Sequence, residues 1–468
     1  MEDKILSVGI DIGTSTTQII FSQITVQNTA NSFLVPNIKI TDIKIIYRSG
    51  IYFTPLISRE KINLKKLKEI ILKEYEMAGI CKKNISTGAI IITGETAGKE
   101  NAKEVLNVLS DLAGDFVVAT AGPDLEAILA GYGAGACDIS KNKAIKIINF
   151  DIGGGTTNCA VFSEGKVVDS FAFDIGGRLI QFDEEDKIIY ISDKIKKLIY
   201  NLKLNLSIGE KPEFDDLKIL TDVFAKVIFE TFNNQDLSRE EEKLFIQHKS
   251  KNMKSQFLMF SGGVSEFVYS SLKIDTLSDT LRFKDIGPVL GYSIRQIFKT
   301  QKDKLLQPKE KIRATVIGAG SHSIKISGST IMFEDDILPV KSIPIVKIPM
   351  GEDEETESIY KNICSKSRMY KDTNWAIAFR GPKSPKYSQI KKIASAIVKA
   401  FSCSDNPIIV IIESDFAKAL GQTIKNIDSN HKIVCIDNIE VTNGDYIDIG
   451  KSISGVVPVV IKTLIFKG

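Results

Sequence analysis

The chain has 468 residues, of which 43% are hydrophobic and 25% are charged, as in an ordinary globular protein. Its 61 Lys and Arg against 58 Asp and Glu leave a formal charge of +3, too small for the broad basic surface that nonspecific nucleic-acid binding needs. No long apolar run and no signal-like start occur, so neither a membrane span nor secretion is expected. Six cysteines without a C-x-x-C pair fit a reducing cytoplasm and predict neither disulfides nor a zinc site.

A repeat at an offset of 140 residues is the most informative feature of the sequence. The segment Asp11 to Thr17 matches Asp151 to Thr157, with Asp, Ile, Gly and both Thr identical. Each copy lies between two apolar, β-branched runs, and this pattern predicts a β-hairpin. Two hairpins opened by an Asp, with several elements between them, predict two similar α/β lobes that face each other.

Between the hairpins the pattern predicts a helix over 64–75, a strand over 89–93 and a further short strand over 117–119. A helix is predicted over 123–130, because Pro123 stands near its start with Asp124 and Glu126 in its first turn. After the second hairpin the chain is more polar: 194–204 is lysine-rich, and the stretches near Pro212 and at 233–242 have the pattern of solvated connections or helix faces. These stretches are predicted to be loops and insertions.

The rest of the chain contains two further glycine turns and a C-terminal unit. The turns are predicted at 260–266 and 317–322. Strands over 375–379 and 408–412 flank a helix over 390–401 and predict an α/β module. Asn443-Gly444 is typical of a hairpin turn, here between 436–441 and 446–449.

The duplicated turn has the chemistry that a nucleoside triphosphate requires. Glycine lets backbone N–H groups approach phosphate oxygens, and the hydroxyls of Thr14, Ser15 and Thr156 add donors. Asp11 and Asp151 would hold Mg²⁺, largely through its waters. The alternative is a set of plain tight turns, but no packing requirement calls for Asp, Gly and paired Thr twice. The repeat therefore predicts an ATP site between the lobes.

Hydrolysis of ATP needs a water held in line with the γ-phosphate, and a carboxylate can orient it. Asp124 and Glu126 are the candidates, although acidic residues in a first helical turn are also ordinary partners of the helix dipole. Other signatures are excluded: the segment 94–100 lacks the spacing of a P-loop, and Gly318-Ala319-Gly320 lacks the third glycine of a dinucleotide fingerprint. The three histidines, His248, His322 and His431, are isolated and are expected to be structural or surface residues.

Together these motifs resemble the ATPase superfamily shared by actin, the heat-shock chaperones and the sugar kinases. The resemblance implies α/β, duplicated actin-like lobes of the ribonuclease H type, with a nucleotide cleft between them and helix 123–131 as the first connection. Gly287 to Arg295 would be the second connection. Asp11, Asp151, Glu126 and Asp124 would be catalytic, with Asp11 and Asp151 also holding the metal. The expected nucleotide-binding residues are Gly13, Thr14, Ser15, Thr16, Gly153, Gly154, Gly155, Thr156, Thr157, Ser261, Gly262, Gly263 and Val264.

A closer resemblance covers nearly the whole chain. The segments 93–102, 150–158, 260–266, 314–322 and 444–466 are similar to the family of reactivating factors of ethanolamine ammonia-lyase. That family implies a chaperone-like ATPase that uses Mg-ATP to release damaged cobalamin from the lyase, so that intact adenosylcobalamin can rebind. The sequence has no D-x-H-x-x-G cobalamin signature, so the cobalamin belongs to the partner.

The resemblance divides the chain into a first lobe at 1–145, a second at 146–330 and a C-terminal module at 331–468. Gly122 replaces the acidic residue that precedes the corresponding proline in heat-shock chaperones, and no lysine is assigned to the γ-phosphate, so slow turnover is expected. The expected location is the cytoplasm, with association to an ethanolamine-utilisation microcompartment and homo-oligomer formation left open. A small-molecule kinase and a nucleotide-controlled filament protein on the same fold are the alternatives.

Overall fold

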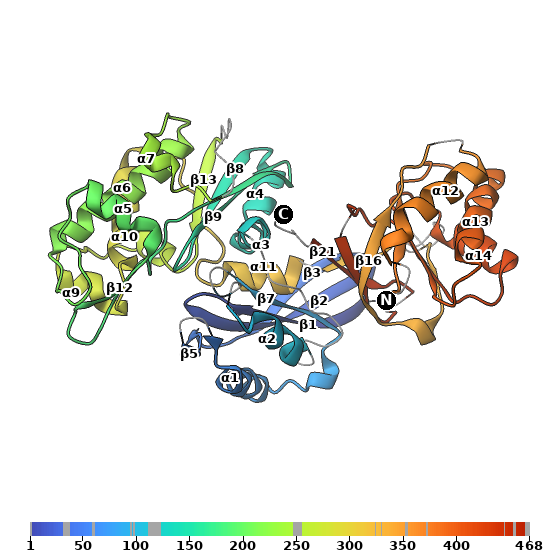
Figure 1. Ribbon diagram of the computed structural model, residues 1–468, viewed down its shortest axis with the longest axis horizontal. Helices are drawn as coiled ribbons and strands as arrows, with labels where there is room; N and C mark the ends of the chain where they lie inside the picture. The colour runs from blue at the N-terminus through green and yellow to red at the C-terminus, as the bar shows by residue number, and fades with distance from the viewer. Residues whose placement is uncertain are drawn as a thin grey trace.

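The computed structural model describes residues 2–30, 38–58, 61–93, 96, 99–110, 123–246, 255–322, 324–328, 330–351, 354–370, 373–443, 445–452 and 455–463. The strand predicted at 117–119 and His248 lie outside these residues, as does the side chain of His322. Three sheets, each with its own helices, form three parts that Figure 1 shows in blue, in green and in orange to red. Within the described ranges, no helix combines the length and apolar character needed to cross a membrane.

The first sheet is built on the first Asp-x-Gly hairpin. Strand β1 (Glu2–Ile12) pairs antiparallel with β2 (Thr16–Asn28) and parallel with β7 (Thr87–Ile92). The order is β3-β2-β1-β7, with β3 (Ile38–Arg48) at one edge and β4 (Tyr52–Phe53) paired to β2. Apolar residues of α1 (Leu64–Met77) and α2 (Ala102–Ser110) pack on this sheet. The predicted hairpin, helix and strand of this lobe are confirmed.

The second sheet repeats the first. Strand β8 (Lys146–Ile152) pairs antiparallel with β9 (Thr157–Ser163) and parallel with β13 (Phe257–Ser261), and β10 (Lys166–Phe173) completes the order β10-β9-β8-β13. The second predicted hairpin is therefore also confirmed, and so is the duplication.

Three helices pack in the core of the second lobe. The helices are α5 (Asp193–Asn201), α6 (Phe214–Phe232) and α10 (Gly287–Ile297). The prediction of loops was wrong at 194–201, which belong to α5, and at 239–242, which form a short helix, whereas the stretch near Pro212 and residues 233–238 are loops as predicted. In α5 a lysine-rich face is exposed while an apolar stripe of Ile195, Leu198 and Ile199 is buried. In α6 the stripe includes Leu220, Phe224 and Ile228, which join the core of this lobe together with Ile294 of α10.

Two helices cross between the lobes near the centre of Figure 1. Helix α3 (Pro123–Ala134) packs on the second sheet, α11 (Ala314–His322) packs on the first, and the two helices pack on each other. The glycine turn predicted at 317–322 was wrong, because these glycines lie inside α11. They permit close contact: a Cβ at Gly318 would collide with the carbonyl of Leu129, and one at Gly133 with that of Ala314.

The second connection between the lobes is also corrected. The predicted connection, Gly287 to Arg295, forms α10, which packs on α6 and on α8 (Ser265–Val268) inside the second lobe. The helix that meets α3 at the junction is instead α11. The domain boundaries near residues 145 and 330 stay predictions.

The C-terminal part is a mixed sheet of order β14-β21-β20-β16-β17-β18-β19-β15. Its strands are β14 (Ile324–Ile326), β15 (Met332–Phe333), β16 (Val340–Lys347), β17 (Ala376–Phe379), β18 (Ile408–Ile412), β19 (Ile433–Ile436), β20 (Asp445–Ile449) and β21 (Pro458–Thr463). The run from β16 to β19 is parallel, with helices α12 (Thr356–Ser367), α13 (Tyr387–Phe401) and α14 (Ala417–Ile427). The predicted α/β module is confirmed.

The hairpin predicted between 436–441 and 446–449 is wrong, and Gly444 of its predicted turn lies outside the described residues. Strand β20 pairs with β16 and β21, whereas β19 pairs with β15 and β18, so the chain crosses between distant strands of the sheet at this point. On the other side, Val460 of β21 packs with Ile5 and Ile24 of the first sheet. This contact attaches the C-terminal module to the first lobe.

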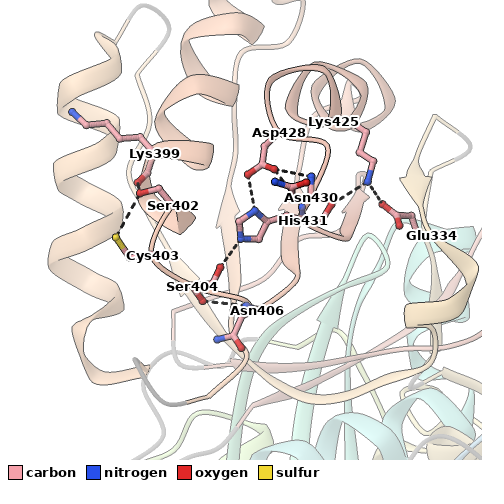
Figure 2. Close-up of polar contacts among 10 residues, drawn as sticks. All are labelled: Glu334, Lys399, Ser402, Cys403, Ser404, Asn406, Lys425, Asp428, Asn430 and His431. Atoms are coloured by element: carbon pink, nitrogen blue, oxygen red, sulfur yellow. Dashed lines mark hydrogen bonds and ion pairs between the residues drawn. The ribbon is translucent and has the colours of Figure 1, made fainter.

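His431 joins two connections of the C-terminal module, as Figure 2 shows. Its Nδ1 lies 2.6 Å from Asp428 Oδ2, and its Nε2 lies 2.6 Å from the carbonyl oxygen of Ser404. Burial alone would lower the pKa of His431, but the two acceptors outweigh it and raise the pKa. The structural role expected for this histidine is confirmed.

The remaining elements are short or lie at the edges of the three parts. They are β5 (Leu56–Ser58), β6 (Lys61–Ile62), α4 (Ala136–Lys143), β11 (Ile180–Phe182), β12 (Ile188–Ile191), α7 (Arg239–Glu242) and α9 (Leu277–Thr280), with short 3₁₀ helices at Lys82–Asn84, Leu281–Phe283, Phe298–Gln301, Asp335–Ile337 and Arg368–Tyr370.

Candidate functional site

A cleft of about 590 Å³ lies between the two lobes where the duplicated hairpins turn. Its volume is in the range of small-molecule sites. Most of the predicted site residues line it: Asp11, Gly13, Thr14, Ser15, Thr16, Glu126, Asp151, Gly153, Gly154, Gly155, Thr156, Gly262, Gly263 and Val264. The two repeated turns therefore face one cavity, as the repeat predicted.

Asp11 lies at the end of β1 and is almost fully buried. Its Oδ1 accepts a hydrogen bond of 3.0 Å from Thr93 Oγ1, which follows the neighbouring parallel strand β7. Burial raises the pKa of Asp11 to about 7, the Thr93 bond opposes the rise and the charge of Asp151 adds to it. The influence of Asp151 shows that the two carboxylates lie close enough to repel each other.

Asp151 occupies the equivalent place at the end of β8. Its Oδ1 accepts a 2.6 Å hydrogen bond from Ser261 Oγ at the end of β13, and its Oδ2 accepts a 3.4 Å bond from Thr315 Oγ1 of α11. Burial raises the pKa of Asp151 to about 6, while both hydroxyls lower it. Both lobes thus place a buried carboxylate at a strand end and fix it with a hydroxyl from the next parallel strand.

The two turns touch at Ser15 and Gly154. A Cβ at Gly154 would collide with Ser15 Oγ, so the approach depends on glycine at this position. Each turn is closed by an equivalent backbone hydrogen bond: Gly13 N donates to Thr16 O at 2.9 Å, and Gly153 N donates to Thr156 O at 3.0 Å. Local sequence therefore builds two equal turns, and the tertiary fold brings them into contact.

Two polar atoms of the cleft have no partner within the described part of the chain. They are Ser15 Oγ and Gln18 Oε1, both buried, whereas Gln18 Nε2 donates to the carbonyl of Ile312 at 3.0 Å. Buried polar groups are normally hydrogen-bonded, so orphaned ones at a cavity wall fit a polar ligand. Unpaired polar atoms of this kind are expected in loops that bind phosphate.

The second lobe also contributes apolar residues to the cleft. Gly262 has a φ of +82° and lies against the backbone of Ile152, where a Cβ would collide. The apolar lining residues that follow it are Val264, Phe267, Phe283, Pro288 and Ile312. A lining of apolar side chains together with polar turns suits a ligand with both an apolar and an anionic group, as in a nucleotide.

Three predicted site residues do not line the cleft. Asp124 accepts a 2.8 Å hydrogen bond from Ser170 Oγ of β10, away from the cavity. Thr157 is buried and donates to the carbonyl of Ile175 at 2.8 Å. Ser261 reaches the site only through Asp151. Of the two candidate water-positioning carboxylates, the cleft includes Glu126.

Sequence reasoning missed several cleft residues, including Gln18, Thr93, Arg178, Asp285 and Thr315. Thr93 could have been found as the residue after the strand expected beside β1, because such strand ends meet at one edge. Gln18 follows the repeated motif and matches Asn158: their side-chain amides lie 3.5 Å from Thr16 Oγ1 and 3.4 Å from Thr156 Oγ1, respectively. Arg178 and Asp285 come from segments without a motif, and Thr315 lies in the segment 314–322, in which the glycines gave the sequence signal and the hydroxyl gave none.

The donor set fits a magnesium ion that keeps most of its water. In the described residues, no group of three or more His, Cys, Asp or Glu side chains comes together that could hold a metal by itself. The cleft instead offers Asp11 and Asp151, one from each turn. Mg²⁺ typically binds through one or two carboxylates together with substrate phosphates and water.

Comparison with known proteins agrees with this architecture. The family model of the ethanolamine utilisation protein EutA matches residues 3–467. The chain is 33% identical over 468 residues to ethanolamine ammonia-lyase reactivase EutA of Salmonella typhimurium and 32% identical over 467 residues to that of Escherichia coli strain K12, each covering 99% of both proteins.

Solved structures with a similar fold include a Ppx/GppA family member of Aquifex aeolicus, 16% identical with a TM-score of 0.36, covering 68% of this chain and 88% of that chain. Another is the ethanolamine utilization protein EutJ of Carboxydothermus hydrogenoformans, 14% identical with a TM-score of 0.33, covering 67% of this chain and 89% of that chain. The fold class is α/β with two lobes built on the duplicated hairpins, and the family match covers nearly every residue. The chain belongs to the ethanolamine utilisation protein EutA family.

Proposed function

We propose that this protein reactivates ethanolamine ammonia-lyase, using Mg-ATP to release damaged cobalamin so that intact adenosylcobalamin can bind. One observation carries the nucleotide part: Asp11 and Asp151, on separate lobes, line the same cleft where Ser15 meets Gly154. The lyase as partner rests on the family, whose curated relatives in Salmonella typhimurium and Escherichia coli are named as its reactivases. The proposal places the protein in the cytoplasm with its partner.

The residues of the cleft divide the work. The turns that contain Gly13 and Gly153 cradle the phosphates, and the orphaned hydroxyl of Ser15 donates to them. Asp11 and Asp151 hold the hydrated magnesium, which neutralises phosphate charge when it is bound. Glu126 orients the hydrolytic water, since it lines the cleft and Asp124 does not.

The lobes can move relative to each other at the crossing of α3 and α11. A nucleotide that contacts both turns binds best at one lobe angle, and this difference in affinity shifts the equilibrium between open and closed lobes. The C-terminal sheet packs on the first lobe through Val460, so it would follow that lobe. We propose that this coupled movement acts on the lyase.

The test mixes the protein with cyanocobalamin-inhibited ethanolamine ammonia-lyase, Mg-ATP and fresh adenosylcobalamin, and measures recovered deaminase activity. The expected result is recovery with wild type and its loss with Asp151→Ala. Asp236→Ala changes an exposed aspartate between α6 and α7 and serves as the matched control. Absence of recovery with any nucleotide would contradict the proposal.

Two further measurements decide between the alternatives. ATP consumption that a small hydroxylated compound stimulates without the lyase would indicate a kinase. Nucleotide-dependent sedimentation without reactivation would indicate a filament protein. The expected result is that neither effect occurs and that recovery of the lyase requires both the protein and Mg-ATP.

A further inference from the structure

Arg178 is the cleft residue that the predicted site leaves without a role. It follows Gly176-Gly177 after β10, and its backbone N donates to the carbonyl of Gly154 at 2.6 Å. The side chain then runs along the second turn, because its Cβ and Cδ lie 3.5 Å from where a Cβ of Gly154 would be. The stem of Arg178 is therefore fixed to the turn that contacts Ser15 of the opposite lobe.

The guanidinium of Arg178 reaches the first lobe. Its Cζ lies 5.6 Å from the ring centroid of Phe53 in β4, the short strand paired to β2 beside Thr16. Phe53 is 67% exposed, so this cation–π contact is a weak one. The pair nevertheless joins the two lobes across the cleft wall, since β4 pairs with the first sheet and Arg178 lies in the turn after β10 of the second sheet.

The guanidinium has no strong anionic partner in the described part of the chain. Besides Phe53, it contacts Gln181 Oε1 at 3.5 Å, which is uncharged. The charge of Arg178 acts on Asp285, but Asp285 Oδ1 accepts a hydrogen bond of 2.9 Å from the backbone N–H of Gly287. The other arginine of the cleft, Arg313, is already bonded to the carbonyl of Ser49 at 2.9 Å.

We propose that Arg178 binds the terminal phosphates of the nucleotide and exchanges its contact with Phe53 for them. This inference rests on the proposed nucleotide function and deepens it. The sequence assigned no lysine to the γ-phosphate, and Arg178 would supply the positive charge there. A planar guanidinium makes paired, charge-assisted hydrogen bonds to phosphate, which are stronger than an exposed cation–π contact. Nucleotide binding therefore rearranges a contact between the lobes at the same place where the two turns meet.

The test compares two variants with similar stems and different charge. Arg178→Lys keeps a cation, whereas Arg178→Met keeps the aliphatic stem along Gly154 and removes the charge. The affinities for Mg-ATP and Mg-ADP are measured by calorimetry. Arg178→Met is expected to weaken Mg-ATP binding about tenfold or more, the size of a lost hydrogen bond to a charged group, and Mg-ADP binding by less. Arg178→Lys is expected to retain most of the affinity.

Three controls separate the loss of phosphate binding from a general loss of folding and from the loss of the contact between Arg178 and the Phe53 ring. Arg239→Ala removes an exposed arginine of α7 in the same lobe and is expected to bind like wild type. Phe53→Ala is expected to change Mg-ATP affinity by less than about threefold, because the exposed cation–π contact is weak. Thermal unfolding of each variant checks that the fold is intact.

Several outcomes would overturn the inference. Equal losses for Mg-ATP and Mg-ADP would place the Arg178 contact on a group that both nucleotides share, either the nucleoside or the inner phosphates, and not on the terminal phosphate of ATP. Equal affinities of Arg178→Met and Arg178→Lys would show that the charge is not used. In both cases wild type still binds nucleotide and the proposed function stands, whereas wild type that binds neither nucleotide would remove the proposed function itself.

Discussion

The two Asp-x-Gly turns are copies of one design, and the differences between them are informative. Each ends a strand with a buried carboxylate and closes with the same backbone bond. Asp151 accepts hydrogen bonds from two hydroxyls and has a pKa of about 6, whereas Asp11 accepts one from Thr93 and has a pKa of about 7. The extra hydroxyl comes from Thr315 of α11, so the crossing helix distinguishes the second turn from the first. Two turns with the same local sequence therefore hold carboxyl groups with different pKa values, because their tertiary contacts differ.

The largest effect should come from removing either carboxylate charge. Asp11→Asn and Asp151→Asn are each expected to lower the rate of lyase reactivation about 100-fold or more, because metal-held charge stabilisation is worth several kcal/mol. Reactivation rates at saturating Mg-ATP measure this. A near-normal rate in one variant would show that the two turns do not act as a pair.

The contact between the turns can be broken at Gly154. Gly154→Ala should weaken Mg-ATP binding about tenfold, because overpacking typically costs 1–3 kcal/mol and the new Cβ collides with Ser15 Oγ. Adding Ser15→Gly removes the collision, so Gly154→Ala should cost less in that background. Gly50→Ala is the matched control, since Gly50 does not line the cleft and its Cβ would meet only the Tyr52 ring, at 3.5 Å. An equal cost of Gly154→Ala in both backgrounds would contradict the contact.

The pH dependence sharpens the comparison of the two carboxyls. Their pKa values are raised from 3.8 to about 7 and about 6, so the folded protein binds protons where the unfolded chain has released them. Without ligand, their contribution therefore lowers stability as the pH rises from about 4 to about 7.

Magnesium requires the ionised carboxylates, so Mg-ATP should offset this loss. The gain in Tm on adding Mg-ATP should be larger at pH 8 than at pH 5.5, by a few degrees. The double variant Asp11→Asn/Asp151→Asn should lose this difference, which separates it from titration of ATP itself. A Tm gain that is equal at both pH values in wild type would refute the assignment of these carboxylates to the metal.

The smallest effect should follow from removing single hydroxyls. Thr93→Val removes the only hydroxyl bond that an oxygen of Asp11 receives among the described residues and should raise the pKa of Asp11 further, by about half a unit to one unit. Ser261→Ala should do the same for Asp151, although Thr315 still donates there. The pH at which the Tm gain appears reports both shifts. A larger shift for Ser261→Ala than for Thr93→Val would contradict the compensating role of Thr315.

Much of the fold was predictable from the sequence wherever the spacing of apolar residues within one segment indicates its secondary structure. The two hairpins, helix α1 and strand β18 followed from alternating or helical apolar spacing and from turn residues. The wrong predictions share one cause. They concern residues whose type is explained by contacts with residues distant in the sequence. The glycines of α11 suggested a turn but permit close approach to α3 and β1, and Asn443-Gly444 follows a strand that pairs elsewhere in the sheet.

The sequence alone determined the two acidic turns, the family and the presence of three α/β parts, because these depend on residues that are close along the chain. Only the tertiary structure decided that Ser15 meets Gly154, that Thr315 reaches Asp151 and that Arg178 reaches Phe53. Such contacts join residues more than 100 positions apart, and their geometry depends on how α3 and α11 pack between the sheets. The local sequence determines which functional side chains each turn contains, whereas the packing of the helices determines which of these side chains come into contact.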